Sequence, residues 1–412
     1  MEERTPRWTA GGPGTDLAAP GHYAGTRHVA VWREARRRHP VAWAESGRAG
    51  GFWSVTGHDL GTRVLRHAGA FGSAQGMRLV SNPAAVRAAA NKMLVVSDGT
   101  AHRRLRAAHA AWFGSRAVGA LEPVLARRID ALLRRHVAGG AAFDAVGGLA
   151  VHVPMWALFA MMDVPDADQE ELARLTAVAF DDADESRAAA RARAAAHAGI
   201  FGYFTDLVRR RRARPGSDLV SALTRAEVAG RRLTDEEVVL NCDGLLNGGL
   251  ETTPHAISGA ILALARHPEA WRRLRQEPEL AGPAVEEVLR WTSPAMQAMR
   301  TATGDVTLGP AAVRRGDRVV VWLPSCNLDE AVFDDAGTFR VDRHPNPHLA
   351  FGTGPHHCIG AGLARLELRC FLAAMTRLVD AVEVVGTPVR RPSSFLHGLA
   401  RLDVRLTPRP AA

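Results

Sequence analysis

The chain has 412 residues, of which 47% are apolar and 23% are charged, which excludes a wholly disordered protein. Lysine and arginine total 52 against 43 acidic residues, giving a formal net charge of +9. The arginines are interleaved with acidic residues along the chain, so we expect a basic solvated surface and no nucleic-acid partner.

The four cysteines contain no C-x-x-C pair and are too few for a disulfide framework. No stretch of 18 apolar residues is present, and the first residues lack the apolar segment of a secretory signal. We therefore expect a cytoplasmic protein with no membrane partner. Residues 1–22, rich in Pro and Gly, are predicted to form a flexible tail.

Downstream of this tail, residues 29–40 have a helical pattern, residues 52–55 read as a strand, and residues 70–97 read as a long loop with a short helix. Residues 102–214 are helical in composition. Thr234 and Glu237 form a capping-box pattern. It opens a helix that runs to about residue 266, on the order of 45 Å.

After residue 294 the pattern changes to short strands, predicted at 306–308, 319–323, 382–385 and 402–406. The expected fold class is thus mainly α with a minor β part. No repeat or linker divides the chain, which favours a single domain over residues 23–412.

Residues 351–362, Phe-Gly-Thr-Gly-Pro-His-His-Cys-Ile-Gly-Ala-Gly, surround Cys358 with glycines just before a helix. Glycines permit close backbone approach, and a helix N-terminus favours a thiolate. Three interpretations stand at this point: a buried structural cysteine, a zinc site with the neighbouring histidines, and an axial thiolate for haem iron.

The pattern Phe351-Gly-x-Gly-x-His-x-Cys-x-Gly resembles the haem-binding loop of the cytochrome P450 family at every defining position. The resemblance implies that fold, with haem b held between a long distal helix and a proximal helix with its Cys loop. Cys358 is then the iron ligand, Phe351 packs near its sulfur, and His356 contacts a propionate. Gly352 and Gly360 shape the loop.

Residues 248–254, Gly-Gly-Leu-Glu-Thr-Thr-Pro, place poor helix formers in the middle of the predicted long helix. This indicates either two helices joined by a turn or one helix that is locally opened. The segment is similar to the distal-helix motif of the same family. That similarity implies that Glu251 and Thr252 deliver protons to bound O2, and that Gly249 leaves space over the iron.

Further motifs fit the resemblance. Glu287-x-x-Arg290 looks like the buried Glu-x-x-Arg motif of the family, with Arg343 as its third, structural member. His102 and Arg106 share a helix face and, with Arg300, match propionate-binding positions. Two prolines usual before His102 in the family are missing here.

The resemblance implies a monooxygenase that uses O2 and two electrons, originating from NAD(P)H and delivered by a ferredoxin or flavodoxin, to hydroxylate a small or peptide-like secondary metabolite. Oxidative coupling, epoxidation or desaturation, and a non-catalytic haem protein, remain alternatives. Acidic redox partners would dock on Arg103, Arg104, Arg365 and Arg369. The expected substrate pocket contains Met93, Leu245, Gly248, Ala295, Met296, Gln297, Met299, Phe395 and Leu396, with Gln297 as the polar group that orients the substrate.

Overall fold

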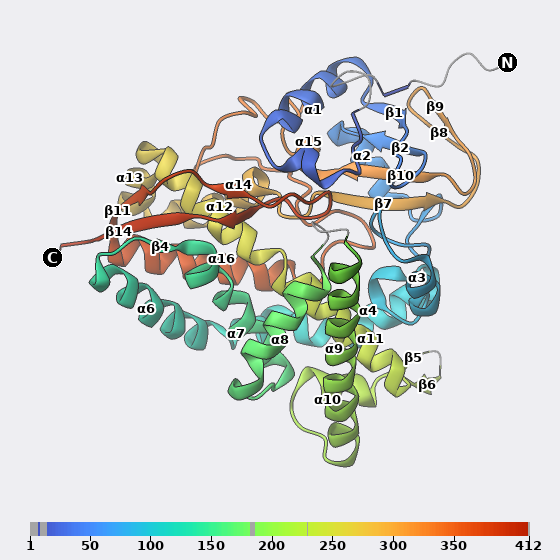
Figure 1. Ribbon diagram of the computed structural model, residues 1–412, viewed down its shortest axis with the longest axis horizontal. Helices are drawn as coiled ribbons and strands as arrows, with labels where there is room; N and C mark the ends of the chain where they lie inside the picture. Colours follow the sequence, from blue (N-terminus) through green and yellow to red (C-terminus); the bar gives the residue numbers. More distant parts are fainter. Residues whose placement is uncertain (1–6, 9–14, 182–185, 229, 411–412) are drawn as a thin grey trace.

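The fold is described by a computed structural model over residues 7–8, 15–181, 186–228 and 230–410. Helices make up 54% of the chain and strands a smaller part (Figure 1), which confirms the predicted fold class. In Figure 1 the largest sheet lies at one end with α1 and α2, and the helices from α7 to α11 lie at the other. In the described part of the chain, no single helix is long and apolar enough to cross a membrane.

The helices of the first half are α1 (Arg27–Arg38), α2 (His58–Arg66), α3 (Pro83–Ala89), α4 (Gly99–Phe113), α5 (Ser115–Gly119), α6 (Glu122–Gly139), α7 (His152–Met162), α8 (Asp166–Ala179) and α9 (Arg187–Ala213). Those of the second half are α10 (Leu219–Arg225), α11 (Asp235–Leu250), α12 (Thr253–Arg266), α13 (Pro268–Gln276), α14 (Ala281–Thr292), α15 (Leu323–Cys326) and α16 (Ala361–Leu378). Short turns of 3-10 or π-helix are η1 (Pro20–Tyr23), η2 (Leu94–Val96), η3 (Val146–Ala150) and η4 (Pro278–Leu280).

Five strands form the largest sheet in the order β1-β2-β10-β7-β3: β1 (Val41–Ala44), β2 (Phe52–Val55), β10 (Arg318–Trp322), β7 (Gln297–Ala302) and β3 (Phe71–Gly72). The remaining strands are β4 (Phe143–Asp144), β5 (Glu227–Val228), β6 (Arg231–Arg232), β8 (Val306–Leu308), β9 (Ala311–Val313), β11 (Val379–Val384), β12 (Val389–Arg390), β13 (Leu399–Arg401) and β14 (Asp403–Pro408). The predicted strands at 52–55 and 306–308 are confirmed with their bounds, and the other three are confirmed with shifted ends.

The sheet joins segments from both ends of the chain. Strand β2 pairs in parallel with β10, placing Ser54 opposite Val320, and β10 pairs antiparallel with β7. A parallel pair requires a long crossover connection, and here that connection contains the helices from α2 to α14. The first hundred and last hundred residues thus share one sheet.

The largest apolar core lies among α6, α12, α14, α16 and the sheet of β11 and β14. A second core fills the space between α7, α8, α9, α10 and α11. Helix α11 begins with the predicted capping box, in which Thr234 accepts from the Glu237 amide and the Glu237 carboxylate accepts from the Thr234 amide. The two cores enclose the space where the functional residues gather.

The N-terminal prediction needs correction. Leu17 and Ala18 are buried and pack with Tyr23, whose hydroxyl donates to the Leu17 carbonyl at 2.8 Å. The chain is therefore packed from residue 15 onward, and the predicted loose tail through residue 22 is wrong for that part. Residues 1–6 and 9–14, which the same prediction covers, lie outside the described residues.

Candidate active site

A large cavity lies between the α11–α12 pair on one side and the Cys358 loop with α16 on the other. The Cys358 sulfur belongs to the loop wall, whereas Gly248, Gly249 and Thr252 belong to the opposite wall. The structure thus brings together two motifs that lie about a hundred residues apart in the sequence.

The loop around Cys358 is held by its own backbone. The Cys358 amide donates to the Phe351 carbonyl at 2.9 Å. Gly354 has φ +77°, and a Cβ there would lie 2.6 Å from the Leu65 carbonyl oxygen, so only glycine fits. A Cβ on Gly360 would lie 3.9 Å from the Cys358 sulfur. The glycines therefore let the loop pass close to its neighbours while its sulfur faces the cavity.

Burial raises the pKa of the Cys358 thiol, and a backbone N–H from Gly360 together with Arg106 and Arg365 lowers it only in part. A further cation at the sulfur, such as a bound metal ion, would favour its thiolate form. Zinc does not fit, because among the described residues no group of three or more His, Cys, Asp and Glu could hold a metal ion. The remaining donor set is a single sulfur, the arrangement of an axial thiolate.

Next to the sulfur, the predicted propionate residues form a basic cluster of His102, Arg106, Arg300 and His356, all of which line the cavity. Burial lowers the pKa of Arg300 to about 10 and that of His102 to about 4. The two imidazole rings of the cluster lie 4.0 Å apart, and the His102 Nε2 atom has no hydrogen-bond partner among the described residues.

Asp98 borders this cluster, with its carboxylate 3.4 Å from His356 Nε2. Although burial raises the pKa of Asp98, the hydrogen bonds from His356 and from the Ser73 and Ala74 amides lower it to about 2. Asp98 therefore ties the loop at residues 73–74 to the start of α4. The two prolines that the family usually has before His102 are missing here, yet His102 and Arg106 both line the cavity wall.

These observations allow a test of whether haem b fits. Neither Arg106 nor Arg300 has a carboxylate within ion-pair distance in the described part of the chain, and Arg300 donates only to the Met299 carbonyl at 2.8 Å. A buried guanidinium without an anion is unfavourable. A planar group that carries a metal ion for Cys358 and two carboxylates for the cluster satisfies all these residues, and haem b has this composition.

The distal helix is interrupted at Glu251 and Thr252, between α11 and α12. Both residues keep right-handed helical backbone angles, so the interruption is a local opening. The Thr252 hydroxyl donates to the Gly248 carbonyl at 2.9 Å, replacing a lost backbone hydrogen bond. Of the two expected alternatives, the geometry favours one helix that is locally opened. Thr252 lines the cavity, while Glu251 is buried behind it.

The two glycines of this helix differ in their surroundings. A Cβ on Gly249 would lie 3.1 Å from the Leu158 side chain, whereas a Cβ on Gly248 would meet nothing within 4 Å. Gly249 therefore allows α7 to pack closely on α11. The open space of the cavity lies over Gly248, which corrects the assignment of that space to Gly249.

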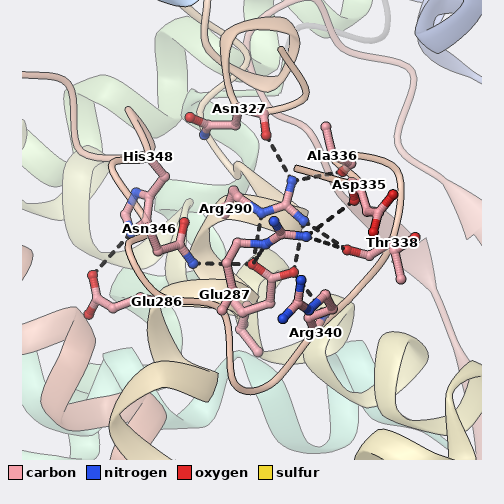
Figure 2. Close-up of polar contacts among 12 residues, drawn as sticks. Glu286, Glu287, Arg290, Asn327, Asp335, Ala336, Thr338, Arg340, Asn346 and His348 are labelled. Carbon is pink, nitrogen blue, oxygen red and sulfur yellow. Dashed lines mark hydrogen bonds and ion pairs between the residues drawn. The ribbon is translucent and has the colours of Figure 1, made fainter. Parts of the chain in front are cut away.

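Figure 2 shows the Glu287 carboxylate at the centre of a buried polar cluster. Arg290 donates to it from Nε at 2.7 Å and from Nη2 at 2.8 Å, and Arg343 donates from Nε at 3.1 Å. The Arg340 amide and the Asn346 side chain donate as well, at 2.8 and 3.1 Å. The predicted three-residue charge cluster forms, and it anchors residues 338–346 just upstream of the Cys358 loop.

Of the expected pocket residues, six line the cavity: Met93, Leu245, Gly248, Ala295, Gln297 and Phe395. Met296, Met299 and Leu396 do not, and the prediction is wrong for them. Alternate strand residues point to opposite faces. Because Ala298 and Arg300 face the cavity, Met299 points the other way and packs in the core with Met296. Leu396 is buried next to Phe395 in the same way.

Gln297 lines the cavity, but its amide is already engaged. Its Oε1 accepts from the Leu79 amide at 2.9 Å, and its Nε2 donates to the Ser394 carbonyl at 2.8 Å. The side chain is 2% exposed. It therefore fastens two loops of the pocket to each other, and the prediction that it orients a substrate does not fit this geometry.

Sequence reasoning missed Glu367, a buried carboxylate on α16 that lines the cavity. Burial raises its pKa to about 8, which a hydrogen bond with Thr253 only partly opposes. Its Oε2 atom has no partner among the described residues. The sequence did contain a signal for this buried carboxylate, because Glu367 lies between Leu366 and Leu368 on the apolar face of a predicted helix.

Of the four arginines expected to face a redox partner, Arg103, Arg104 and Arg369 are exposed. Arg365 is different. It forms two hydrogen bonds with the Glu286 carboxylate, at 2.7 and 2.8 Å, and stacks 4.7 Å from the Phe351 ring. Arg365 therefore supports the Cys loop and is neutralised in part by Glu286, while its side chain stays 32% exposed; that it faces a partner remains a prediction.

A curated relative, cytochrome P450 NovI of Streptomyces niveus, is 35% identical over 395 residues, covering 95% of this chain and 96% of the relative. This chain belongs to the cytochrome P450 family. The family profile for Cytochrome P450 matches residues 187–380 of this P450. Its fold matches P450 OxyD, described as involved in the biosynthesis of vancomycin-type antibiotics, with a TM-score of 0.87, 36% identity, and 96% and 100% of the two chains covered.

P450BioI, solved in complex with a fatty-acid-ligated acyl carrier protein, matches this P450 with a TM-score of 0.85 at 27% identity, covering 94% of this chain and 99% of the other. The family relationship makes the protein a P450 monooxygenase, an oxidoreductase that uses haem-thiolate chemistry and O2 on a small-molecule substrate with electrons from a redox partner.

Proposed function

We propose that this P450 hydroxylates a small or peptide-like secondary metabolite. The observation that carries the proposal is the Cys358 sulfur facing a cavity whose opposite wall presents Thr252. NovI and the antibiotic-biosynthesis enzyme OxyD, at 35% and 36% identity, support a secondary-metabolite substrate. Epoxidation, desaturation and coupling within the same pocket are the alternative outcomes.

In this proposal Cys358 holds haem b, and His102, Arg106, Arg300 and His356 hold its carboxylates. When bound, the haem supplies the activation of O2 for insertion into a C–H bond. The Thr252 hydroxyl donates its own proton to the Gly248 carbonyl, so its Oγ1 atom accepts a hydrogen bond on the cavity wall and holds a proton donor there. The Glu251 carboxyl next to it in the chain supplies the proton, which is general acid catalysis. The apolar cavity wall excludes water from the reacting carbon.

The electrons come from an acidic ferredoxin or flavodoxin, supplied in turn by NAD(P)H. Arg103 and Arg104 on α4 and Arg369 on α16 are exposed and form no ion pair with any residue that the structure describes, so they offer positive charge at the surface. Opposite charges steer such encounters. The protein is expected to act in the cytoplasm, where these donors are found.

The test is the absorption spectrum of the reduced protein under carbon monoxide. A strongly red-shifted Soret band supports thiolate-ligated haem, and Cys358→Ala should abolish it. Absence of any Soret band in the haem-reconstituted wild type contradicts the proposal. Substrates are then sought by the low-to-high spin shift, with each candidate offered both free and tethered to a carrier protein, because P450BioI was solved with a carrier protein.

A further inference from the structure

The distal half of the cavity, between α11 and the loops at residues 77–95 and 294–297, is mainly apolar. In the described part of the chain, five neutral polar side chains on these elements and at the start of α12 line it: Asn241, Asn247, Thr252, Thr253 and Gln297. The charged lining residues, Arg106, Arg300 and Glu367, belong to the basic cluster or to α16. A substrate in the distal half therefore meets few groups that can fix its orientation.

Four of these five side chains are already engaged. Thr253 forms a hydrogen bond with the Glu367 carboxyl group. The Asn241 Oδ1 accepts from the Leu94 amide at 3.0 Å, and its Nδ2 donates to the carbonyls of Lys92 and Glu237 at 2.8 and 2.7 Å. The Gln297 side chain accepts a hydrogen bond from the Leu79 amide and donates one to the Ser394 carbonyl. The Thr252 hydroxyl donates to Gly248.

Asn247 is the exception, because its carboxamide makes no hydrogen bond to any described residue. It is half-buried on α11, directly before Gly248, where the cavity is open. A carboxamide offers two donor hydrogens and an acceptor oxygen. A polar group that a bound substrate removes from water without replacing its hydrogen bonds costs binding free energy. The pocket therefore favours a substrate with a matching polar group at this point.

We propose that Asn247 orients the substrate by hydrogen bonding to a neutral polar group, such as a hydroxyl, a carbonyl or an amide. The group is neutral because the distal half presents no unpaired charge in the described residues. The inference rests on the proposed function and deepens it.

The test uses aryl imidazoles, whose ring nitrogen ligates the iron and so holds the aryl group in the distal half whatever the role of Asn247. The probes are phenylimidazoles with an ortho, meta or para hydroxyl, each compared with its methyl counterpart by optical titration. For at least one position, Asn247→Leu should reduce the hydroxyl-over-methyl preference about 5- to 50-fold, the effect of one buried hydrogen bond. Met93→Leu, an apolar change in the same wall, should leave it unaltered.

The outcomes separate the two claims. A wild type without the red-shifted carbon monoxide band contradicts the proposed function itself. Wild-type and Asn247→Leu proteins with the normal band but the same hydroxyl preference at all three positions overturn the role of Asn247. Should Asn247→Leu take up no haem, Asn247→Ala removes the same amide with no added bulk, and the same comparison decides.

Discussion

The buried carboxylate of Glu287 is expected to contribute more to stability than any exposed acid in this protein. Its side chain is 0% exposed and accepts from two guanidinium groups, a backbone amide and the Asn346 side chain. Glu287→Gln keeps the size but removes the charge, and it places an NH2 group against donors. Breaking a buried ion pair from one side costs about 3–5 kcal/mol, because the partner charges remain buried.

The matched control is Glu269→Gln. Glu269 and Arg272 have the same i,i+3 spacing, and their atoms lie 2.6 Å apart, but their side chains are 67% and 57% exposed. Exposed pairs contribute about 0–1 kcal/mol. The two variants thus remove the same kind of i,i+3 pair, one buried among further hydrogen-bond donors and one exposed to solvent.

The assay is denaturant unfolding of the haem-loaded proteins, followed by far-UV circular dichroism and by the Soret band. For Glu287→Gln we expect the free energy of unfolding to fall by about 3–5 kcal/mol, a large share of a typical total, and haem to be lost at lower denaturant. For Glu269→Gln we expect a change within about 1 kcal/mol. Equal losses in the two variants would refute the reasoning from burial.

Three further predictions follow from the site. Glu367 is protonated in the folded state up to about pH 8, against an ordinary pKa of 4.5. The contribution of Glu367 to the free energy of unfolding is therefore complete below pH 4.5. It decreases as the pH rises toward 8, by up to about 1.4 kcal/mol per pH unit. Glu367→Gln should flatten this dependence between pH 5.5 and 7.5 in urea unfolding, and an unchanged slope would contradict it. Gln297→Leu leaves a buried amide and a buried carbonyl unpaired, so the free energy of unfolding should fall by about 2–4 kcal/mol; an unchanged thermal midpoint would show that the two loops do not depend on Gln297. Reversing the charges at Arg103 and Arg104 together should slow reduction by an acidic ferredoxin, more so at low salt. Equal stopped-flow rates at all salt concentrations would exclude docking on this face.

Much of the site was predictable because its motifs are local. The Cys358 loop, the Gly248–Pro254 segment and the Glu287-Arg290 pair each contain their information within a few residues. Their mutual placement follows from the fold, and the fold class was evident from helical periodicity and short strands. The capping box at Thr234 was likewise readable, since it depends on two residues three apart.

The features of the site that the sequence did not predict depend on contacts between residues far apart in the chain. Gln297 and Met299 lie two residues apart on β7 and so share a face of the strand, yet only Gln297, at the start of the strand, lines the cavity. The engagement of Gln297 depends on Leu79 and Ser394, over two hundred and nearly one hundred positions away. Arg365 looked exposed because its partner, Glu286, lies on another helix. Residue type indicates what a side chain can do, but neighbours decide whether it is free to do it.

The parallel pairing of β2 with β10 has a consequence for the order in which this protein forms. Residues 52–55 are made early, yet their partner strand ends at Trp322. Strand β1 can pair with one edge of β2 as soon as both are made, but the other edge has no partner until β10 is complete. That pairing closes a very long loop, which slows folding. Strand β7, which carries Arg300, pairs with the same late strand. The part of the cavity wall that carries Arg300 can therefore reach its final position only after residue 322 has been made.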